Sequence, residues 1–179
     1  MRRLFLCHDI GGAELLVAYK ESRFPDEPAL FIGDGPAAEL FEKNGMQIAR
    51  VSMGVQFSEV ICELATKYGI EEAFCSTGTT AYEVTAMRAI MGQGVRTSAL
   101  VEHWTNYRER FGYPEIDWVD NLPDRVIFFD DHAVEIARQL GFPEELILKE
   151  ANPLTELRKK KFMSLEDSIG VLEIGLAVS

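Results

Sequence analysis

The sequence predicts an α/β fold, a three-layer sandwich built on a mostly parallel sheet of about six strands, with a C-terminal tail. Two observations predict it: short apolar runs alternate with longer segments whose apolar residues recur at helical spacing, and glycine or polar turns separate the two. Such alternation is typical of strand–helix–strand units, whose right-handed crossovers place helices on both faces of a parallel sheet. Apolar residues make up 47% of the 179 residues, enough for one buried core.

The predicted strands are short and apolar, and they cover 4–7, 29–32, 46–51, 73–75, 95–101 and 125–129. The predicted helices cover 13–20, 36–43, 58–68, 80–91 and 133–140. Pro36 suits a first helical turn, and Ser58 suits an N-cap position. Thr80 and Glu83 have the spacing of a capping box, and Gly69 suits a helix end.

Residues 1–151 carry this pattern, and residues 152–179 form the tail. The pattern breaks at Asn152-Pro153; Ser164 to Asp167 could begin a short helix, and apolar residues alternate from Val171 to Ser179 as in a strand. A strand at the end of a chain needs a partner. The tail is therefore expected to start a second domain or to act as a packing or dimerisation element.

Charge and composition exclude several classes of function. The formal net charge of -11 argues against nucleic acid as a partner, since phosphate backbones are bound by clustered Lys and Arg. No apolar run is long enough to predict a membrane span, and the N-terminus turns polar too soon for a signal peptide. Three cysteines in apolar surroundings predict buried thiols and a cytoplasmic protein, although Cys7 or Cys75 could instead be reactive.

Polar residues follow four of the predicted strands. In an open parallel sheet, ligands bind outside the carboxyl ends of the strands. The residues there are His8, Asp9, Gly11 and Gly12 after the first strand, Ser76, Thr77, Gly78, Thr79 and Thr80 after the fourth, Glu102, His103, Trp104, Tyr107, Arg108 and Arg110 after the fifth, and Asp130, Asp131 and His132 after the sixth. All three histidines adjoin a carboxylate there, which favours a shared cleft over the alternative of ordinary loop polarity and helix capping.

These residue types favour sugar or phosphate binding with acid–base chemistry. Glycines before a helix let a ligand approach the backbone, and the hydroxyl-bearing turn at 76–80 can cradle a phosphate or sugar, or merely cap a helix. Histidine can act as an acid or a base near neutral pH, and Asp9 can fix the tautomer of His8, which makes this pair the candidate catalytic residues.

The loop after the fifth strand has two interpretations. Arg108 and Arg110 could hold a carboxylate or phosphate in a forked geometry. In the alternative, Trp104, Tyr107 and Phe111 pack the loop onto the domain, and the arginines pair with Glu109, Glu115 or Asp117.

Other chemistries are less well supported. A metal held by His8, His103 and His132 with Asp9 or Asp131 lacks any short-range ligand spacing, so no metal is expected. The three-glycine dinucleotide fingerprint, a Walker lysine and a nucleophile elbow do not occur, so no cofactor is expected.

Several segments together resemble a known family. They are His8 to Glu14, Ser76 to Thr80, Glu102 to Phe111, Leu122 to Asp124, Asp130-Asp131, Gly141 to Pro143 and Asn152-Pro153. In this order they resemble the N-terminal domain of GT-B-type glycosyltransferase-like proteins of bacterial surface polysaccharide biosynthesis, a group distantly related to UDP-GlcNAc 2-epimerase. The segment from Trp104 to Phe111 is the most specific, and the match adds Glu14 to the candidate ligand-binding residues.

The resemblance implies a Rossmann-like acceptor-side domain that binds a sugar, sugar phosphate or nucleotide-sugar at the carboxyl edge of the sheet. In two-domain members the C-terminal domain holds most of the nucleotide-sugar, and the chain reaches Ser179 where that domain would begin. Glycosyl transfer is therefore expected to need a separately encoded second domain or a homodimer. The alternatives are a non-catalytic ligand-binding or assembly module and, third, a small metal-dependent hydrolase.

Overall fold

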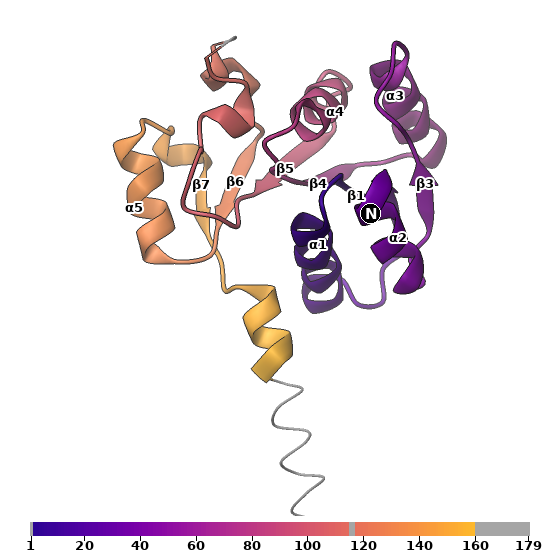
Figure 1. Ribbon diagram of the computed structural model, residues 1–179, viewed down its shortest axis with the longest axis horizontal. Coiled ribbons are helices and arrows are strands. Elements are labelled where there is room, and N and C mark those ends of the chain that lie inside the picture. Colours follow the sequence, from indigo (N-terminus) through magenta and orange to yellow (C-terminus); the bar gives the residue numbers. More distant parts are fainter. Residues whose placement is uncertain (1, 115–116, 160–179) are drawn as a thin grey trace, which may run out of the picture.

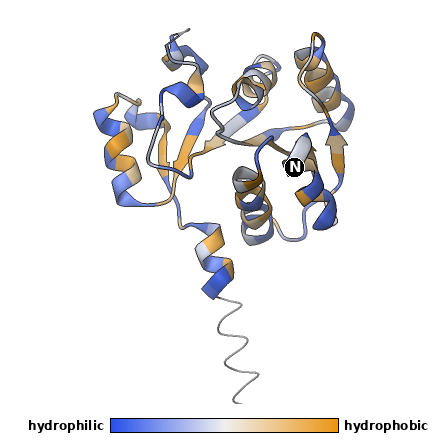
Figure 2. Ribbon diagram, in the orientation of Figure 1, coloured by the Kyte–Doolittle hydropathy of each residue, from blue (hydrophilic) through white to orange (hydrophobic). Residues whose placement is uncertain are grey.

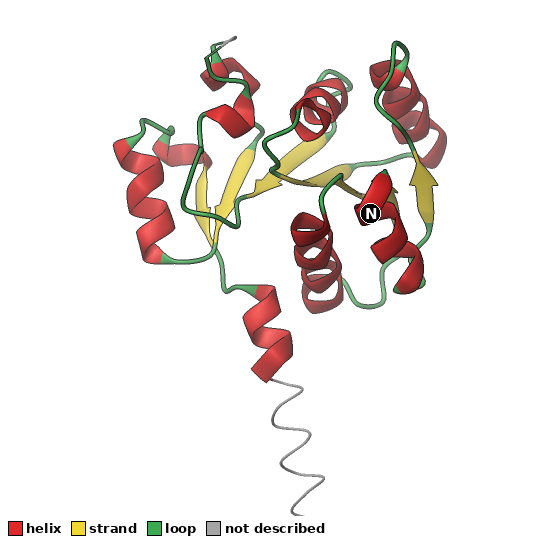
Figure 3. Ribbon diagram, viewed as in Figure 1, coloured by secondary structure: helices red, strands yellow, loops and turns green. Residues whose placement is uncertain are grey.

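The computed structural model describes residues 2–114 and 117–159, which form a seven-stranded sheet between two layers of helices (Figures 1 and 3). The strands are β1 (Arg3–Cys7), β2 (Ala29–Gly33), β3 (Ile48–Arg50), β4 (Glu72–Ser76), β5 (Arg96–Leu100), β6 (Arg125–Phe128) and β7 (Ile147–Lys149). Their order is β3-β2-β1-β4-β5-β6-β7, and each neighbouring pair is parallel. The chain order therefore reverses between β1 and β4, where such sheets form their ligand sites.

The helices cover both faces of the sheet. They are α1 (Ile10–Arg23), α2 (Gly35–Lys43), α3 (Phe57–Tyr68), α4 (Ala81–Met91) and α5 (Asp131–Gln139), with short 3₁₀ turns η1 (Glu109–Phe111), η2 (Trp118–Asn121) and η3 (Glu144–Leu146). Alternate strand residues belong to two cores. Leu4 and Leu6 belong to the core that includes residues of α3, α4 and α5, whereas Phe5 and Cys7 belong to the core that includes residues of α1 and α2. Figure 2 accordingly shows largely hydrophobic strands between helices that carry both colours.

The predicted α/β sandwich is confirmed, with differences in a few elements. The helix α3 begins at Phe57, so Ser58 lies within its first turn and is not its N-cap. The strand β7 was missed because three residues after a 3₁₀ turn are too few to show a period. The first helix begins at Ile10 rather than Ala13, because the Asp9 side chain caps it by accepting a hydrogen bond from the Gly12 N–H. Gly11 and Gly12 therefore lie inside the first turn of α1 and not in a turn before it.

The described start of the tail packs against α1. Residues 153–159 are helical, and Leu154 joins the apolar residues on the α1 side of the sheet. Arg23 donates to Glu156 over 2.7 Å and to the Ala151 carbonyl over 3.0 Å. The helix predicted at 164–167 and the strand predicted at 171–179 lie outside the described residues. Within the described residues, none of the helices combines the length and apolar character needed to cross a membrane.

One buried carboxylate ties four strands together at the amino edge of the sheet. Glu72 on β4 accepts from Arg3 on β1 at 3.0 Å, Arg96 on β5 at 2.8 Å and Arg125 on β6 at 2.7 Å. The parallel register places Arg3, Glu72 and Arg96 side by side. Burial opposes ionisation of Glu72, but hydrogen bonds from Arg3 and Arg125 and the charge of Arg96 outweigh it and hold its pKa below the usual range.

Replacing this carboxylate should destabilise the fold in a pH-dependent way. Glu72→Gln should lower the free energy of unfolding at pH 7 by about 3 kcal/mol, because it removes the buried negative charge that Arg3, Arg96 and Arg125 share. The folded-state pKa is depressed, so the stabilisation is present above the unfolded value of about 4.3 and is lost as the pH falls through the folded-state value. Urea unfolding at pH 7 and about pH 3 measures both effects, with the exposed Glu63→Gln as control. A deficit that stays equal at both pH values would contradict this account.

Candidate functional site

A pocket of about 230 Å³ opens at the carboxyl edge of the sheet, where the chain order reverses. Residues that follow β1, β4 and β5 form its wall. They are Asp9, Gly12, Leu15, Ser76, Thr77, Gly78, Thr79, Thr80, Glu83, Leu100, Glu102, His103 and Arg110. Residues at three of the four predicted strand ends therefore line one pocket, whereas the residues that follow β6 do not.

A close contact between α1 and β4 forms the floor of this pocket. The Gly12 N–H donates to Asp9 Oδ1 over 2.8 Å, which turns the chain directly from β1 into α1. A Cβ on Gly12 would lie 2.6 Å from both Cβ and Oγ of Ser76 and 2.8 Å from Cys7 Sγ. Gly12 is therefore needed for close approach of the helix to the sheet, and not for an unusual backbone conformation.

The hydroxyl-bearing turn after β4 serves two purposes. Thr80 caps α4, because its hydroxyl accepts from the Tyr82 N–H, and Thr77 donates to the Leu100 carbonyl over 3.0 Å. Ser76 is buried, and its hydroxyl oxygen has no hydrogen-bond partner among the described residues. The turn thus includes the helix cap weighed from the sequence, and it also presents polar atoms to the pocket.

Glu83 is a site residue that the sequence interpretation did not include. It is 2% exposed and accepts hydrogen bonds of 3.0 Å from the His8 backbone N–H and from the Thr80 hydroxyl. Burial raises the pKa of its carboxyl group, and the nearby Asp9 charge adds to that increase. The Thr80–Glu83 spacing was the available signal, but it indicated only a capping box.

The loop after β5 supplies the opposite wall. Arg110 is buried and donates to the carbonyl oxygens of Thr105, over 3.1 Å, and Thr77, so it fastens this loop to the turn after β4. Glu102 is half-buried; burial is the main cause of its raised pKa, and the charge of His103 opposes it. Arg110 therefore lines the pocket, but its hydrogen bonds go to carbonyl oxygens and not to Glu109 or Asp117.

The remaining predicted residues of this loop lie outside the pocket lining. Trp104 donates from its indole to Asp130 over 3.0 Å and packs edge-on against His132. Tyr107 is buried against Phe128. These contacts anchor the loop to the β6–α5 side of the domain, which is the packing role weighed from the sequence.

Other predicted residues also act in structure. Arg108 donates to the Leu140 carbonyl over 2.9 Å, Asp130 caps α5, and Asp131 pairs with Lys149 at 2.6 Å. Of the residues near β1, Gly11 and Glu14 lie in α1 without lining the pocket.

The three histidines do not come together. The His8 ring packs against Tyr82 with its centroid 5.1 Å from the tyrosine ring, His132 packs on Trp104, and His103 lines the pocket. Among the described residues, no group close enough to hold a metal ion contains a histidine. Cys7 and Cys75 are buried as predicted, and burial is the largest cause of the raised pKa of both thiols.

Comparison with known proteins gives a likeness of fold. No protein-family model and none of the curated proteins matches the chain. Solved structures do match, and each match covers 85% of this chain. Anabaena HepE in complex with UDP-glucose is 16% identical, with a TM-score of 0.64 and 44% of its chain covered. The UDP-GlcNAc 2-epimerase of Methanocaldococcus jannaschii is 13% identical (TM-score 0.63, 46% of its chain covered), and Acinetobacter baumannii MurG is 8% identical (TM-score 0.61, 45% of its chain covered). The chain spans less than half the length of these proteins. It has a Rossmann-like fold related to the GT-B and 2-epimerase structures, as the resemblance implied.

The close approach at Gly12 gives a prediction for folding. Gly12→Ala should lower the free energy of unfolding by about 2 kcal/mol, because overpacking against Ser76 and Cys7 outweighs the better helix propensity of alanine. Adding Ser76→Gly should restore part of the loss, since it removes the side chain that the new methyl group meets. Gly54→Ala is the control, because a Cβ at that position would meet no atom within 4 Å. Equal thermal unfolding of the Gly12→Ala and Gly54→Ala variants would show that the contact is not tight.

Proposed function

We propose that the chain binds the sugar part of a sugar phosphate or nucleotide-sugar in this pocket, as the acceptor-side half of a glycosyltransferase-like site. The observation that carries the proposal is the pocket itself: carboxylates and hydroxyls gather where the chain order reverses, in a fold shared with HepE, whose structure holds UDP-glucose. Sugar hydroxyls both donate and accept hydrogen bonds, so carboxylates and hydroxyl side chains together match them.

The charge of the pocket favours the sugar over the phosphate. Asp9, Glu83 and Glu102 line it, and Arg110 is its only arginine or lysine among the described residues. Arg110 directs its hydrogen bonds to backbone carbonyls, so it is not free to clamp an anion. A phosphate group deep in the pocket would meet like charges, whereas hydroxyl groups would donate to the same carboxylates.

For catalysis, Asp9 is the proposed base. Its carboxylate lines the pocket, where it could accept the proton of a bound hydroxyl. The His8 ring packs on Tyr82, so His8 takes a positioning role through the hydrogen bond from its backbone to Glu83. A non-catalytic binding module would use the same pocket, and it would keep its function when Asp9 is changed to Asn.

Exposed apolar side chains support a second domain over this edge. Six large ones are exposed among the described residues, and all lie in or next to the connections that follow β1, β3 and β5: Ile10, Met53, Val55, Trp104, Tyr113 and Val119. None of the six lines the pocket, but exposed large apolar side chains in these connections are typical of a surface that another domain covers. We therefore propose that a second domain or a second subunit closes the pocket for glycosyl transfer.

Ligand titration tests sugar binding directly. Isothermal titration and amide shift mapping with UDP-glucose, glucose 1-phosphate and glucose should show binding, with shifts at Gly12 and residues 76–80. Glu102→Gln should weaken binding at least about tenfold, because one charge-assisted hydrogen bond to a hydroxyl is worth roughly 1.5–3 kcal/mol. The matched control is Glu109→Gln, which changes an exposed carboxylate of the same loop.

Two results would overturn the proposal. One is the absence of saturable binding by all three compounds. The other is equal affinity in the Glu102→Gln and Glu109→Gln variants, which would place the ligand elsewhere on the acidic surface.

A further inference from the structure

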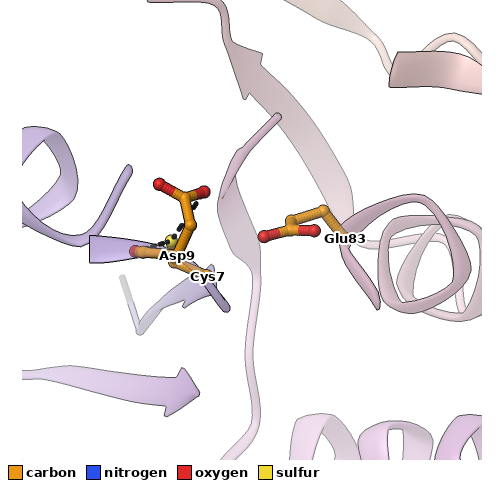
Figure 4. A group of neighbouring side chains, drawn as sticks. All are labelled: Cys7, Asp9 and Glu83. Carbon is orange, nitrogen blue, oxygen red and sulfur yellow. Dashed lines mark hydrogen bonds between the residues drawn. The ribbon is translucent and has the colours of Figure 1, made fainter. Parts of the chain in front are cut away.

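A group of side chains with metal-binding atoms lies where β1 ends opposite α4. The Cys7 thiol and the carboxylates of Asp9 and Glu83 each offer one ligand atom, and these atoms all lie within 4.8 Å of one another. Figure 4 shows Glu83 reaching from α4 toward Asp9 and Cys7. Cys7 and Glu83 are buried, whereas Asp9 is exposed and gives the group an open side.

A fourth polar group adjoins this cluster. Ser76 is 2% exposed, lines the pocket, and has a hydroxyl oxygen without a hydrogen-bond partner among the described residues. It lies beside Cys7, because the Cβ position of Gly12 would be 2.6 Å from Ser76 Oγ and 2.8 Å from Cys7 Sγ. A buried hydroxyl without a partner costs about 1–3 kcal/mol, so a bound ion with its water would satisfy it.

The cluster also has no directly paired positive charge. Among the described residues, no ion pair includes Asp9 or Glu83. Arg110 lines the same pocket, but its hydrogen bonds run to the carbonyls of Thr105 and Thr77.

We propose that Cys7, Asp9 and Glu83 bind a divalent cation of the zinc type, with Ser76 beside the remaining coordination position. Thiolate and carboxylate are both zinc ligands, and in a tetrahedral site their atoms lie roughly 3.4–3.6 Å apart. The observed spacing therefore needs only small side-chain movements. Three protein ligands leave one position toward the pocket, where the metal would lower the pKa of a bound water or hydroxyl.

This metal site differs from the one considered from the sequence, which used the three histidines as ligands. It contains Glu83 instead, which the packing of α4 against β1 brings beside Cys7 and Asp9. It does not rest on the proposed sugar binding, because the binding of the metal is measured without a sugar.

Cobalt provides the test, because a thiolate bound to Co²⁺ gives a charge-transfer band in the near ultraviolet. Metal-stripped full-length protein, kept anaerobic, should bind one equivalent of Co²⁺ with this band, and one equivalent of Zn²⁺ should remove it. Cys7→Ser should abolish the band and weaken Zn²⁺ binding at least about 100-fold, since even changes to groups behind metal ligands cost 10–100-fold. Glu83→Gln should weaken Zn²⁺ binding similarly, and Cys62→Ser, which changes a partly buried thiol on α3, should change neither.

Circular dichroism and thermal unfolding without metal show which variants fold. If Cys7→Ser does not fold, the band of the unchanged protein and the affinity of Glu83→Gln decide the outcome. A missing charge-transfer band, or equal zinc affinity in Glu83→Gln and the unchanged protein, would overturn the metal site. Loss of sugar binding with the band intact would count against the proposed function alone.

Discussion

The pairing of Glu72 with three arginines is the interaction on which the arrangement of this domain depends. It joins β1, β4, β5 and β6 at one edge, across the point where the chain order reverses. Parallel strands aligned at their amino ends also reach the opposite edge together, because each residue advances a strand by about 3.3 Å. The residues that follow β1, β4 and β5 are thereby brought to one place, although they are far apart in the chain.

The second constraint acts at the opposite edge, where α1 and α4 begin. Gly12 lets the first turn of α1 lie directly against Ser76, and Gly78 lies so close to Glu83 that a Cβ there would be 2.8 Å from Oε2. These two contacts bring Asp9 and Glu83 into one pocket from different helices. The same compactness buries Glu83 and Cys7, and this burial raises the pKa of both groups.

The arginines and aromatic residues after β5 contact two different parts of the domain. Arg110 is drawn into the pocket wall, whereas Arg108, only two residues away, binds the Leu140 carbonyl on the α5 side. Trp104 and Tyr107 likewise hold the loop against Asp130 and Phe128. The loop is therefore both a wall of the candidate site and a structural clamp. The packing interpretation holds for Trp104 and Tyr107, whereas Arg108 and Arg110 donate to carbonyl oxygens and pair with none of the described carboxylates.

The fold class and the edge of the sheet at which the site lies follow from the amino-acid order alone. The spacing of apolar residues indicates which segments form strands and which form helices. In a parallel sheet, the ligand-binding residues lie at the carboxyl ends of the strands. The same reasoning identified most of the pocket lining, including Asp9, Gly12, the turn at 76–80, Glu102 and Arg110. Which strand-end residues meet was settled by packing in three dimensions. Glu83 lines the pocket from α4, although its spacing from Thr80 indicated only a helix cap. The His8 ring does not line the pocket, because it packs on Tyr82. Such choices depend on side-chain direction and on contacts between distant segments, which local sequence patterns do not contain.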